Sequence, residues 1–268
     1  MTPRPFADRD TPGWVALSNL VLDRQATVEA FRAEDARRDP AHPMRRWVTL
    51  DGAQIVGMAA LYFWPFDPPG FLHVSVLVHP QRRGRGLGRA LWNHALQEAR
   101  GHRPAGLVTD VSDLDPASLA WAGRRGFHTH AHRFASELDL TAFDETAFET
   151  DLRRAAAQGV TFSDLGSADA TTLERFLNFV ADRLTETPDL AGHPRWPLGQ
   201  VRQALHLDSD PRPDWFILAV SPQGEWLGTT AMIRIRHANM AYNELTATHP
   251  QARGRGLALP LKLQAIPA

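Results

Sequence analysis

The segment that decides the fold is His79-Pro80-Gln81-Arg82-Arg83-Gly84-Arg85-Gly86-Leu87-Gly88-Arg89-Ala90-Leu91, termed here the first cradle. It follows an apolar, strand-like run at 71–78 and opens a run at 87–100 that has the apolar period of a helix. The first backbone N–H groups of a helix have no partner inside the helix, and the helix dipole is positive there. Glycines let the preceding backbone turn so that such N–H groups converge on one anion. The segment therefore predicts a turn that binds a phosphate or pyrophosphate group.

The same segment occurs a second time, because residues 249–261 read His-Pro-Gln-Ala-Arg-Gly-Arg-Gly-Leu-Ala-Leu-Pro-Leu; these residues are termed the second cradle. The two copies are offset by 170 residues, and 9 of their 13 positions are identical. A repeat with this long period predicts two related domains rather than a stack of short repeats. We assign residues 1–140 to a first domain, 141–158 to a helical linker and 159–268 to a second domain.

Hydrophobic periodicity predicts a similar order of elements around each cradle. In the first domain we expect a short strand near 4–6, then helices within 1–45, at 87–100 and at 116–125, strands at 47–50, 55–63, 71–78 and 107–111, and a closing hairpin or strand pair at 127–140. In the second domain we expect strands at 160–165, 215–220, 226–235 and 240–248, and helices at 168–184 and 201–207. The strand at 107–111 should run parallel to the one at 71–78, because a helix connects them.

The second copy stops seven residues after its cradle, so we expect the second domain to lack its last strands. Its final strand would then expose unpaired backbone groups at a sheet edge. We expect the first domain or a second copy of the chain to cover this edge, and a homodimer is the prediction.

The composition is that of a globular protein without a strong overall charge. The 268 residues are 43% hydrophobic and 22% charged, with a net charge of -1, so nothing draws the chain to nucleic acid or to a membrane. Cysteine is absent and no run of 18 apolar residues occurs, so we expect no disulfide, no transmembrane helix and a cytoplasmic location. Three histidines, His128, His130 and His132, would share one face of a strand, but no carboxylate cluster accompanies them, and we expect no metal site.

Two other phosphate-binding motifs do not fit the spacing of the first cradle. A P-loop requires a lysine after its second conserved glycine, and the first cradle contains no lysine. A dinucleotide fingerprint requires a third glycine, but that position falls on Arg89 when counted from Gly84 and on Leu91 when counted from Gly86.

The motifs that remain resemble those of one known family. A Q/R-x-x-G-x-G/A signature occurs at Gln81, Gly84 and Gly86 and again at Gln251, Gly254 and Gly256. The pair Gly126-Phe127 closes a helix in a similar way to the fourth helix of that family. With the order of elements, these features resemble the GNAT acetyltransferase superfamily and its two-domain members. The resemblance implies an α+β fold with two GNAT-like domains, each a mixed, mostly antiparallel sheet with helices on both faces.

The resemblance also implies acetyl-CoA as the co-substrate of an N-acetyltransferase that modifies a small-molecule or peptide amine, mainly in the first domain. In this family the strand before the cradle diverges from the next parallel strand, and the pantetheine arm pairs with its open backbone. A backbone N–H at that place would also stabilise the oxyanion. We expect contacts to the co-substrate at Val76, Leu77, Val78, Arg82, Arg83, Gly84, Arg85, Gly86, Leu87, Gly88 and Arg89.

The amine must be neutral to attack the thioester, so a general base is expected near the strand before each cradle. His73 is the best candidate in the first domain, where Ser75 and His79 also lie on or beside the strand, and Glu244 is placed similarly in the second domain.

The position from which the family often protonates the departing thiolate holds no acid in this sequence. The family often carries a tyrosine four residues before the glycine of the Gly-Phe pair, and that position is Ala122 here. Water or Ser118 would then supply the proton, or no acid would act. The alternative function is therefore an acyl-CoA-binding regulatory or scaffold protein without turnover. We expect the second cradle to be degenerate, because its domain lacks the strand that would form the other wall of the cleft.

Overall fold

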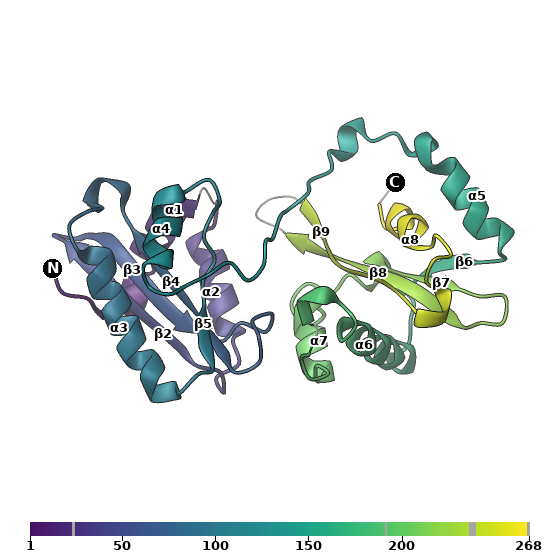
Figure 1. Ribbon diagram of the computed structural model, residues 1–268. Helices are drawn as coiled ribbons and strands as arrows, with labels where there is room; N and C mark the ends of the chain where they lie inside the picture. The colour runs from purple at the N-terminus through teal and green to yellow at the C-terminus, as the bar shows by residue number, and fades with distance from the viewer. Residues whose placement is uncertain (23–24, 191, 236–239, 267–268) are drawn as a thin grey trace. The chain divides into compact units, whose positions relative to one another are not determined.

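A computed structural model of the chain contains two compact units, residues 1–134 and residues 135–268. Each unit contains one sheet with helices packed on it (Figure 1). No helix in the part of the chain that is described is both long enough and apolar enough to cross a membrane. The structure describes residues 1–22, 25–190, 192–235 and 240–266.

The first unit is built on a five-stranded sheet in the order β1-β2-β3-β4-β5. Its strands are β1 (Arg4–Pro5), β2 (Met44–Asp51), β3 (Gln54–Tyr62), β4 (Phe71–Val78) and β5 (Gly106–Val108). Its α-helices are α1 (Thr11–Leu22), α2 (Val28–Ala36), α3 (Leu87–His102) and α4 (Pro116–Gly123). Strands β1 to β4 pair antiparallel, whereas β5 runs parallel to β4, as the sequence predicted.

Alternation of side chains along the strands gives this sheet two apolar faces. One face packs on α3, through a cluster that includes Leu61, Leu72, Val74, Leu91 and Ala95. The other face packs on α1, through a cluster that includes Trp14, Leu17, Val48, Met58 and Ala60, with Phe31 of α2 at its margin. Helices therefore cover both faces of the sheet, which confirms the predicted α+β class.

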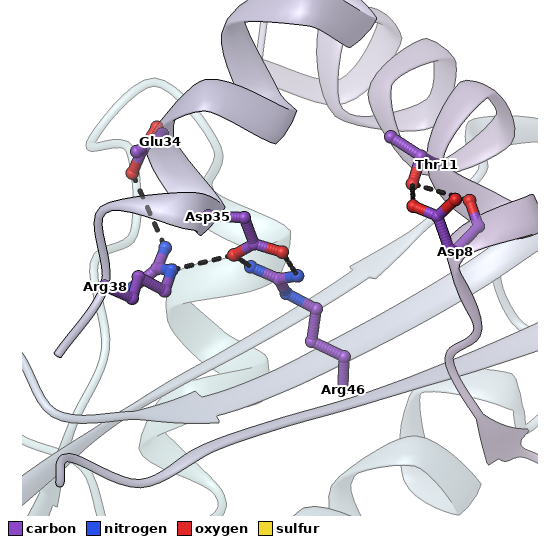
Figure 2. A network of polar contacts seen from close by, with 6 residues as sticks. All are labelled: Asp8, Thr11, Glu34, Asp35, Arg38 and Arg46. Carbon is purple, nitrogen blue, oxygen red and sulfur yellow. Dashed lines mark hydrogen bonds and ion pairs between the residues drawn. The ribbon is translucent and has the colours of Figure 1, made fainter. Parts of the chain in front are cut away.

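An ion pair fixes the end of α2 to strand β2 (Figure 2). The guanidinium of Arg46 donates two hydrogen bonds, each 2.5 Å long, to the carboxylate of Asp35, and Arg38 donates a third of 2.9 Å. Burial alone would raise the pKa of Asp35, but the hydrogen bonds and charge of Arg46 outweigh it and hold this pKa below its usual value. The Arg46 side chain is 8% exposed, so this pair is part of the interior beneath α2.

The second unit contains a four-stranded antiparallel sheet in the order β6-β7-β8-β9. Its strands are β6 (Thr161–Asp164), β7 (Phe216–Val220), β8 (Trp226–Ile235) and β9 (Met240–Thr248). Its α-helices are α5 (Glu149–Ala157), α6 (Ala170–Leu184), α7 (Leu198–Ala204) and α8 (Ala258–Gln264). Among the described residues, β9 is an edge strand.

Helices lie on both faces of this second sheet as well (Figure 1). Helices α5 and α8 share a core with β7 and β8, in which Ala155 and Leu261 are 1% and 0% exposed. On the other face, the rings of Phe176 in α6 and Phe216 in β7 stack with centroids 5.2 Å apart. Helix α5 is thus part of the core of the second unit.

The predicted closing hairpin at 127–140 is wrong, since this segment contains no strand. Most of its side chains are polar or small, and the apolar Phe134 and Leu138 are 86% and 58% exposed. A strand pair without a buried apolar face is not stable in water, which accounts for the difference.

Candidate functional site

Strands β4 and β5 pair over a short distance and then separate. The register joins Phe71 to Gly106, Leu72 to Leu107 and His73 to Val108, where the pairing ends. From residue 74 to residue 78, β4 is paired with β3 alone in the described chain. Beyond His73 the edge of β4 that faces away from β3 therefore has no partner strand in the described chain, and of its carbonyl groups that of Val78 accepts from Nε of Arg83 at 3.4 Å.

The first cradle is a short 3₁₀ turn followed by two glycines in left-handed conformations. Gly84 has φ +76° and Gly86, the residue before α3, has φ +82°. A side chain is strained at such φ values, so the turn requires glycine at both positions. A Cβ on Gly84 would meet nothing within 4 Å, which means that this part of the turn is open rather than packed against the protein.

Hydrogen bonds within the turn decide which N–H groups a ligand can reach. The N–H groups of Arg82 and Arg83 already donate to the carbonyl groups of His79 and Pro80. His79 is engaged as well, because its Nδ1 accepts from the N–H of Gln81 at 3.3 Å. No backbone carbonyl within the described residues accepts from the N–H groups of residues 84–89.

The four arginines of the first cradle fall into two pairs. Arg82 lies 2.7 Å from the carboxylate of Asp51, and Arg83 lies 3.6 Å from that of Asp115. In the described chain no carboxylate pairs with Arg85 or Arg89, and both are exposed. Arg82 and Arg83 therefore hold the turn, whereas Arg85 and Arg89 keep their charges toward solvent.

Ser118 acts as the partner of a helix cap. Its backbone N–H donates to Asp115, the residue before α4, at 3.0 Å, and its Oγ donates to the same carboxylate at 2.7 Å. These hydrogen bonds hold the pKa of Asp115 below its usual value. Ala122, at the position where the family often has a tyrosine, is buried in α4.

His73 lies buried at the point where β4 and β5 separate. Its Nδ1 is 3.0 Å from Oδ2 of Asp67, and its Nε2 is 3.9 Å from Oδ2 of Asp110. The ring of Tyr62 stacks on the imidazole with a centroid distance of 4.8 Å. The two aspartates were not predicted from the sequence, although Asp110, two residues after the parallel strand β5, could have been found from that position.

In the second unit, Glu244 lies at a β-bulge. The pairing of β9 with β8 passes from Leu245 opposite Ala231 to Asn243 opposite Met232, so Glu244 has no partner in the register. Burial raises the pKa of the Glu244 carboxyl to about 7. A carboxylate with such a pKa is suited to accept a proton near neutral pH.

The second cradle keeps the turn of the first but has protein packed against it. Gly254 and Gly256 have φ +75° and +74°. The side-chain amide of Gln158, just after α5, donates to the carbonyl of Arg255 at 3.1 Å and accepts from its Nε at 2.9 Å. Arg154 of α5 lies 3.8 Å from the place of a Cβ on Gly256. Helix α8 has 7 residues, whereas α3 has 16.

The histidines at 128–132 lie in irregular chain rather than on a strand. His132 Nε2 is 3.3 Å from a carboxylate oxygen of Asp113. No group of three or more histidine, aspartate or glutamate side chains in the described part of the chain is arranged to hold a metal ion.

The geometry of the first unit agrees with a comparison to known families, because residues 14–127 match the acetyltransferase (GNAT) family. These residues belong to the GNAT acetyltransferase family. The first unit, which contains these residues, is called the GNAT unit from here on. The matched residues include the first cradle, β4 and the strand β5 that diverges from it, whereas the second cradle lies outside them.

Two curated proteins that are similar to part of this chain are named as acyl- or acetyltransferases. Mycothiol acetyltransferase of Streptomyces coelicolor is 33% identical over 147 residues, which cover 48% of this chain and 41% of that protein. The L-amino acid N-acyltransferase MnaT of Escherichia coli K12 is 34% identical over 104 residues, which cover 35% of this chain and 59% of that protein. The chain thus spans about half the length of the curated relatives it matches.

A solved structure extends the similarity over both units. A tandem GNAT protein from the clavulanic acid biosynthesis pathway, solved without acetyl-CoA, has a TM-score of 0.67 at 22% identity. The match covers 98% of this chain and 84% of that one. The chain is therefore similar in fold to a tandem GNAT protein over both units.

Proposed function

We propose that the protein is an acetyl-CoA-dependent N-acetyltransferase that acts on a small-molecule or peptide amine, with catalysis mainly in the GNAT unit. The observation that carries this proposal is the separation of β4 from β5 after His73, directly before the first cradle. Along the chain, the unpaired edge of β4 is followed directly by the first cradle with its free N–H groups. This order suits a ligand whose extended amide arm would lie on the strand and whose pyrophosphate would lie on the cradle.

The pyrophosphate of acetyl-CoA would bind the N–H groups of residues 84–88, which have no acceptor in the described chain. The exposed guanidinium groups of Arg85 and Arg89 would add charge-assisted hydrogen bonds. Arg82 and Arg83 are proposed to act by holding the turn through Asp51 and Asp115. The pantetheine arm would pair with the open backbone at residues 76–78.

The reaction requires a neutral amine, an acyl carbon held next to it and a place for the developing oxyanion. His73 is the proposed base, because it lies at the point of separation with a second ring nitrogen toward Asp110. A backbone N–H of residues 76–78 would stabilise the oxyanion. Ser118 already donates its hydroxyl proton to Asp115, so water is the proposed acid for the thiolate.

The second unit is proposed to have a degenerate co-substrate site. The pairing of Gln158 with Arg255 and the contact of Arg154 with Gly256 put α5 against the second cradle. Glu244 keeps a position and a pKa suited to a base, but within the described residues no parallel strand lies beside β9.

One observation favours an alternative in which the protein binds acyl-CoA for regulation and does not turn it over. Ala122 in α4 cannot donate a proton, and Ser118 is engaged as a cap partner. Neither of these two residues is then available to protonate the departing thiolate.

Thiol release from acetyl-CoA, measured with a panel of amines, separates the two functions. Turnover with at least one amine, together with acetylation of that amine detected by mass spectrometry, supports the enzyme. Calorimetric binding of CoA without thiol release from any amine would support the regulatory alternative. Absence of CoA binding would contradict both.

A further inference from the structure

His73 lies between a buried and an exposed carboxylate. The residues His73 and Asp67 are 4% and 3% exposed, whereas the side chain of Asp110 is 69% exposed. Asp67 comes from the loop between β3 and β4, and Asp110 comes from the segment just after β5. One ring nitrogen thus faces the interior and the other faces a carboxylate that reaches solvent.

The buried carboxylate fixes which ring nitrogen is protonated. An ionised aspartate can only accept hydrogen bonds, so Nδ1 at 3.0 Å from Asp67 must carry the proton. In the neutral ring, Nε2 then has the free lone pair, and it points toward Asp110. In hydrolases with a catalytic triad an aspartate holds a histidine in the same way, and the histidine takes the proton of the nucleophile.

Burial of the Asp67 carboxylate costs free energy, and a role in orienting the His73 ring would explain why it is buried. Its Oδ1 is buried and has no hydrogen-bond partner among the described residues, so half of the carboxylate is unsatisfied. Most buried polar atoms are hydrogen-bonded, so the unpaired Oδ1 calls for an explanation beyond packing.

Nε2 of His73 and Oδ2 of Asp110 lie close enough together for one ammonium nitrogen beside them to contact both atoms. Nε2 and Oδ2 are 3.9 Å apart, so a single nitrogen can lie within about 2.9 Å of both atoms. Arg133 lies 3.8 Å from the same Asp110 oxygen, and Arg38 lies over the ring of Tyr62 at 5.9 Å. The two groups therefore present one imidazole and one carboxylate to a ligand, with Arg133 beside the carboxylate.

We propose that Asp67 is a positioning residue that holds His73 as the general base, and that Asp110 binds the ammonium group of a cationic amine acceptor. This inference rests on the proposed N-acetyltransferase function and names the residues that receive the acceptor. Asp110 selects the protonated amine, and His73 converts it to the nucleophile.

Each proton and bond in this step has a defined place. One ammonium proton moves to Nε2 of His73, and the freed lone pair forms a C–N bond with the thioester carbon. The C–S bond then breaks, and the thiolate receives a second nitrogen proton through water. The imidazolium returns the first proton to solvent, so the products are the amide, CoA thiol and one proton.

The kinetic test uses the full-length chain and an amine that the wild type acetylates. His73→Gln should lower kcat about 100-fold or more. Asp67→Asn should lower kcat about tenfold or more and leave KM for the amine nearly unchanged, because the wrong tautomer is favoured. Asp110→Asn should raise KM for the amine about tenfold. Asp113→Asn, an exposed aspartate of the same segment, is the control and should match the wild type.

A second readout does not require turnover. Long-range ¹H–¹⁵N spectra of the histidine rings should show the Nδ1–H tautomer for His73 in the wild type and its loss in Asp67→Asn. Butylammonium chloride should shift the His73 signals in the wild type and not in Asp110→Asn.

Wild-type kinetics in Asp67→Asn and Asp110→Asn would overturn the proposal and leave the N-acetyltransferase function standing. An Nε2–H tautomer in the wild type, or shifts with butylammonium that persist in Asp110→Asn, would overturn it as well. If no amine is acetylated, the proposed function fails and the base role of His73 fails with it. The spectra then decide separately whether Asp67 and Asp110 hold the ring and the cation.

Discussion

The two cradles offer a matched pair of substitutions, Gly84→Ala and Gly254→Ala. Both glycines have positive φ, +76° and +75°, and a Cβ on either would meet nothing within 4 Å. Each alanine therefore introduces the same backbone strain and no clash. The strain of a left-handed alanine, less the entropy that alanine removes from the unfolded chain, amounts to roughly 1 kcal/mol in each variant.

The two substitutions should differ in their effect on CoA. In Gly84→Ala, relaxation of the strained φ rotates the neighbouring N–H groups away from the pyrophosphate. Loss of one charge-assisted hydrogen bond, about 1.5–3 kcal/mol, weakens CoA binding roughly 10- to 100-fold. In Gly254→Ala the affinity should not change, because α5 is packed against the second cradle through Gln158 and Arg154.

Titration calorimetry with CoA and thermal unfolding of both variants provide the measurements. We expect similar losses of stability, one binding site per wild-type chain and weaker binding in Gly84→Ala alone. Equal weakening in both variants would show that both cradles bind CoA. Wild-type affinity in Gly84→Ala would refute the assignment of the pyrophosphate to the first cradle.

Three further predictions concern stability. Glu244 has a pKa of about 7 instead of 4.5, so between these pH values it binds a proton that the unfolded chain releases. The free energy of unfolding therefore falls as pH rises through this window. In urea unfolding, Glu244→Gln should raise the free energy of unfolding by about 1–3 kcal/mol at pH 8 and change it little at pH 4.5. Asp35→Ala should lower the free energy of unfolding by about 2–4 kcal/mol. Arg46→Met should lower it less, because Arg38 still pairs with Asp35 when Arg46 is removed. Equal losses for the two variants in urea unfolding would contradict this reasoning. Because the pKa of Asp35 is lowered, its contribution should be present above about pH 4 and lost in more acidic solution. In Gly57→Ala a Cβ would lie 2.9 Å from a buried leucine methyl group of α3, so calorimetric melting should show a loss of about 1–3 kcal/mol, and an unchanged melting temperature would refute the close packing.

Local sequence was sufficient for the elements that carry a strong repeating pattern. The apolar run at 71–78 gave the bounds of β4, and the runs at 226–235 and 240–248 gave those of β8 and β9. The segment at 127–140 was mispredicted, because a pattern of short polar residues does not show whether a partner strand will be there to pair with.

The candidate site shows the same division between local and tertiary information. His73 could be selected from its place on the strand before the cradle, because strand, turn and helix are consecutive in the chain. Asp67 and Asp110 approach it from two different loops, and no local pattern links them to the histidine. Only the tertiary structure gives the distances from His73 to these carboxylates, which show that its imidazole is buried and oriented rather than isolated.

The sequence by itself determined that a glycine turn opens a helix twice, because positive φ and free N–H groups depend on residues that are neighbours in the chain. The tertiary structure alone decided how the two turns differ. Strand β5 separates from β4 beside the first cradle, whereas Gln158 and Arg154 of a distant segment contact the second. Access to an anion site depends on what is packed around it, and packing is set by residues far apart in sequence.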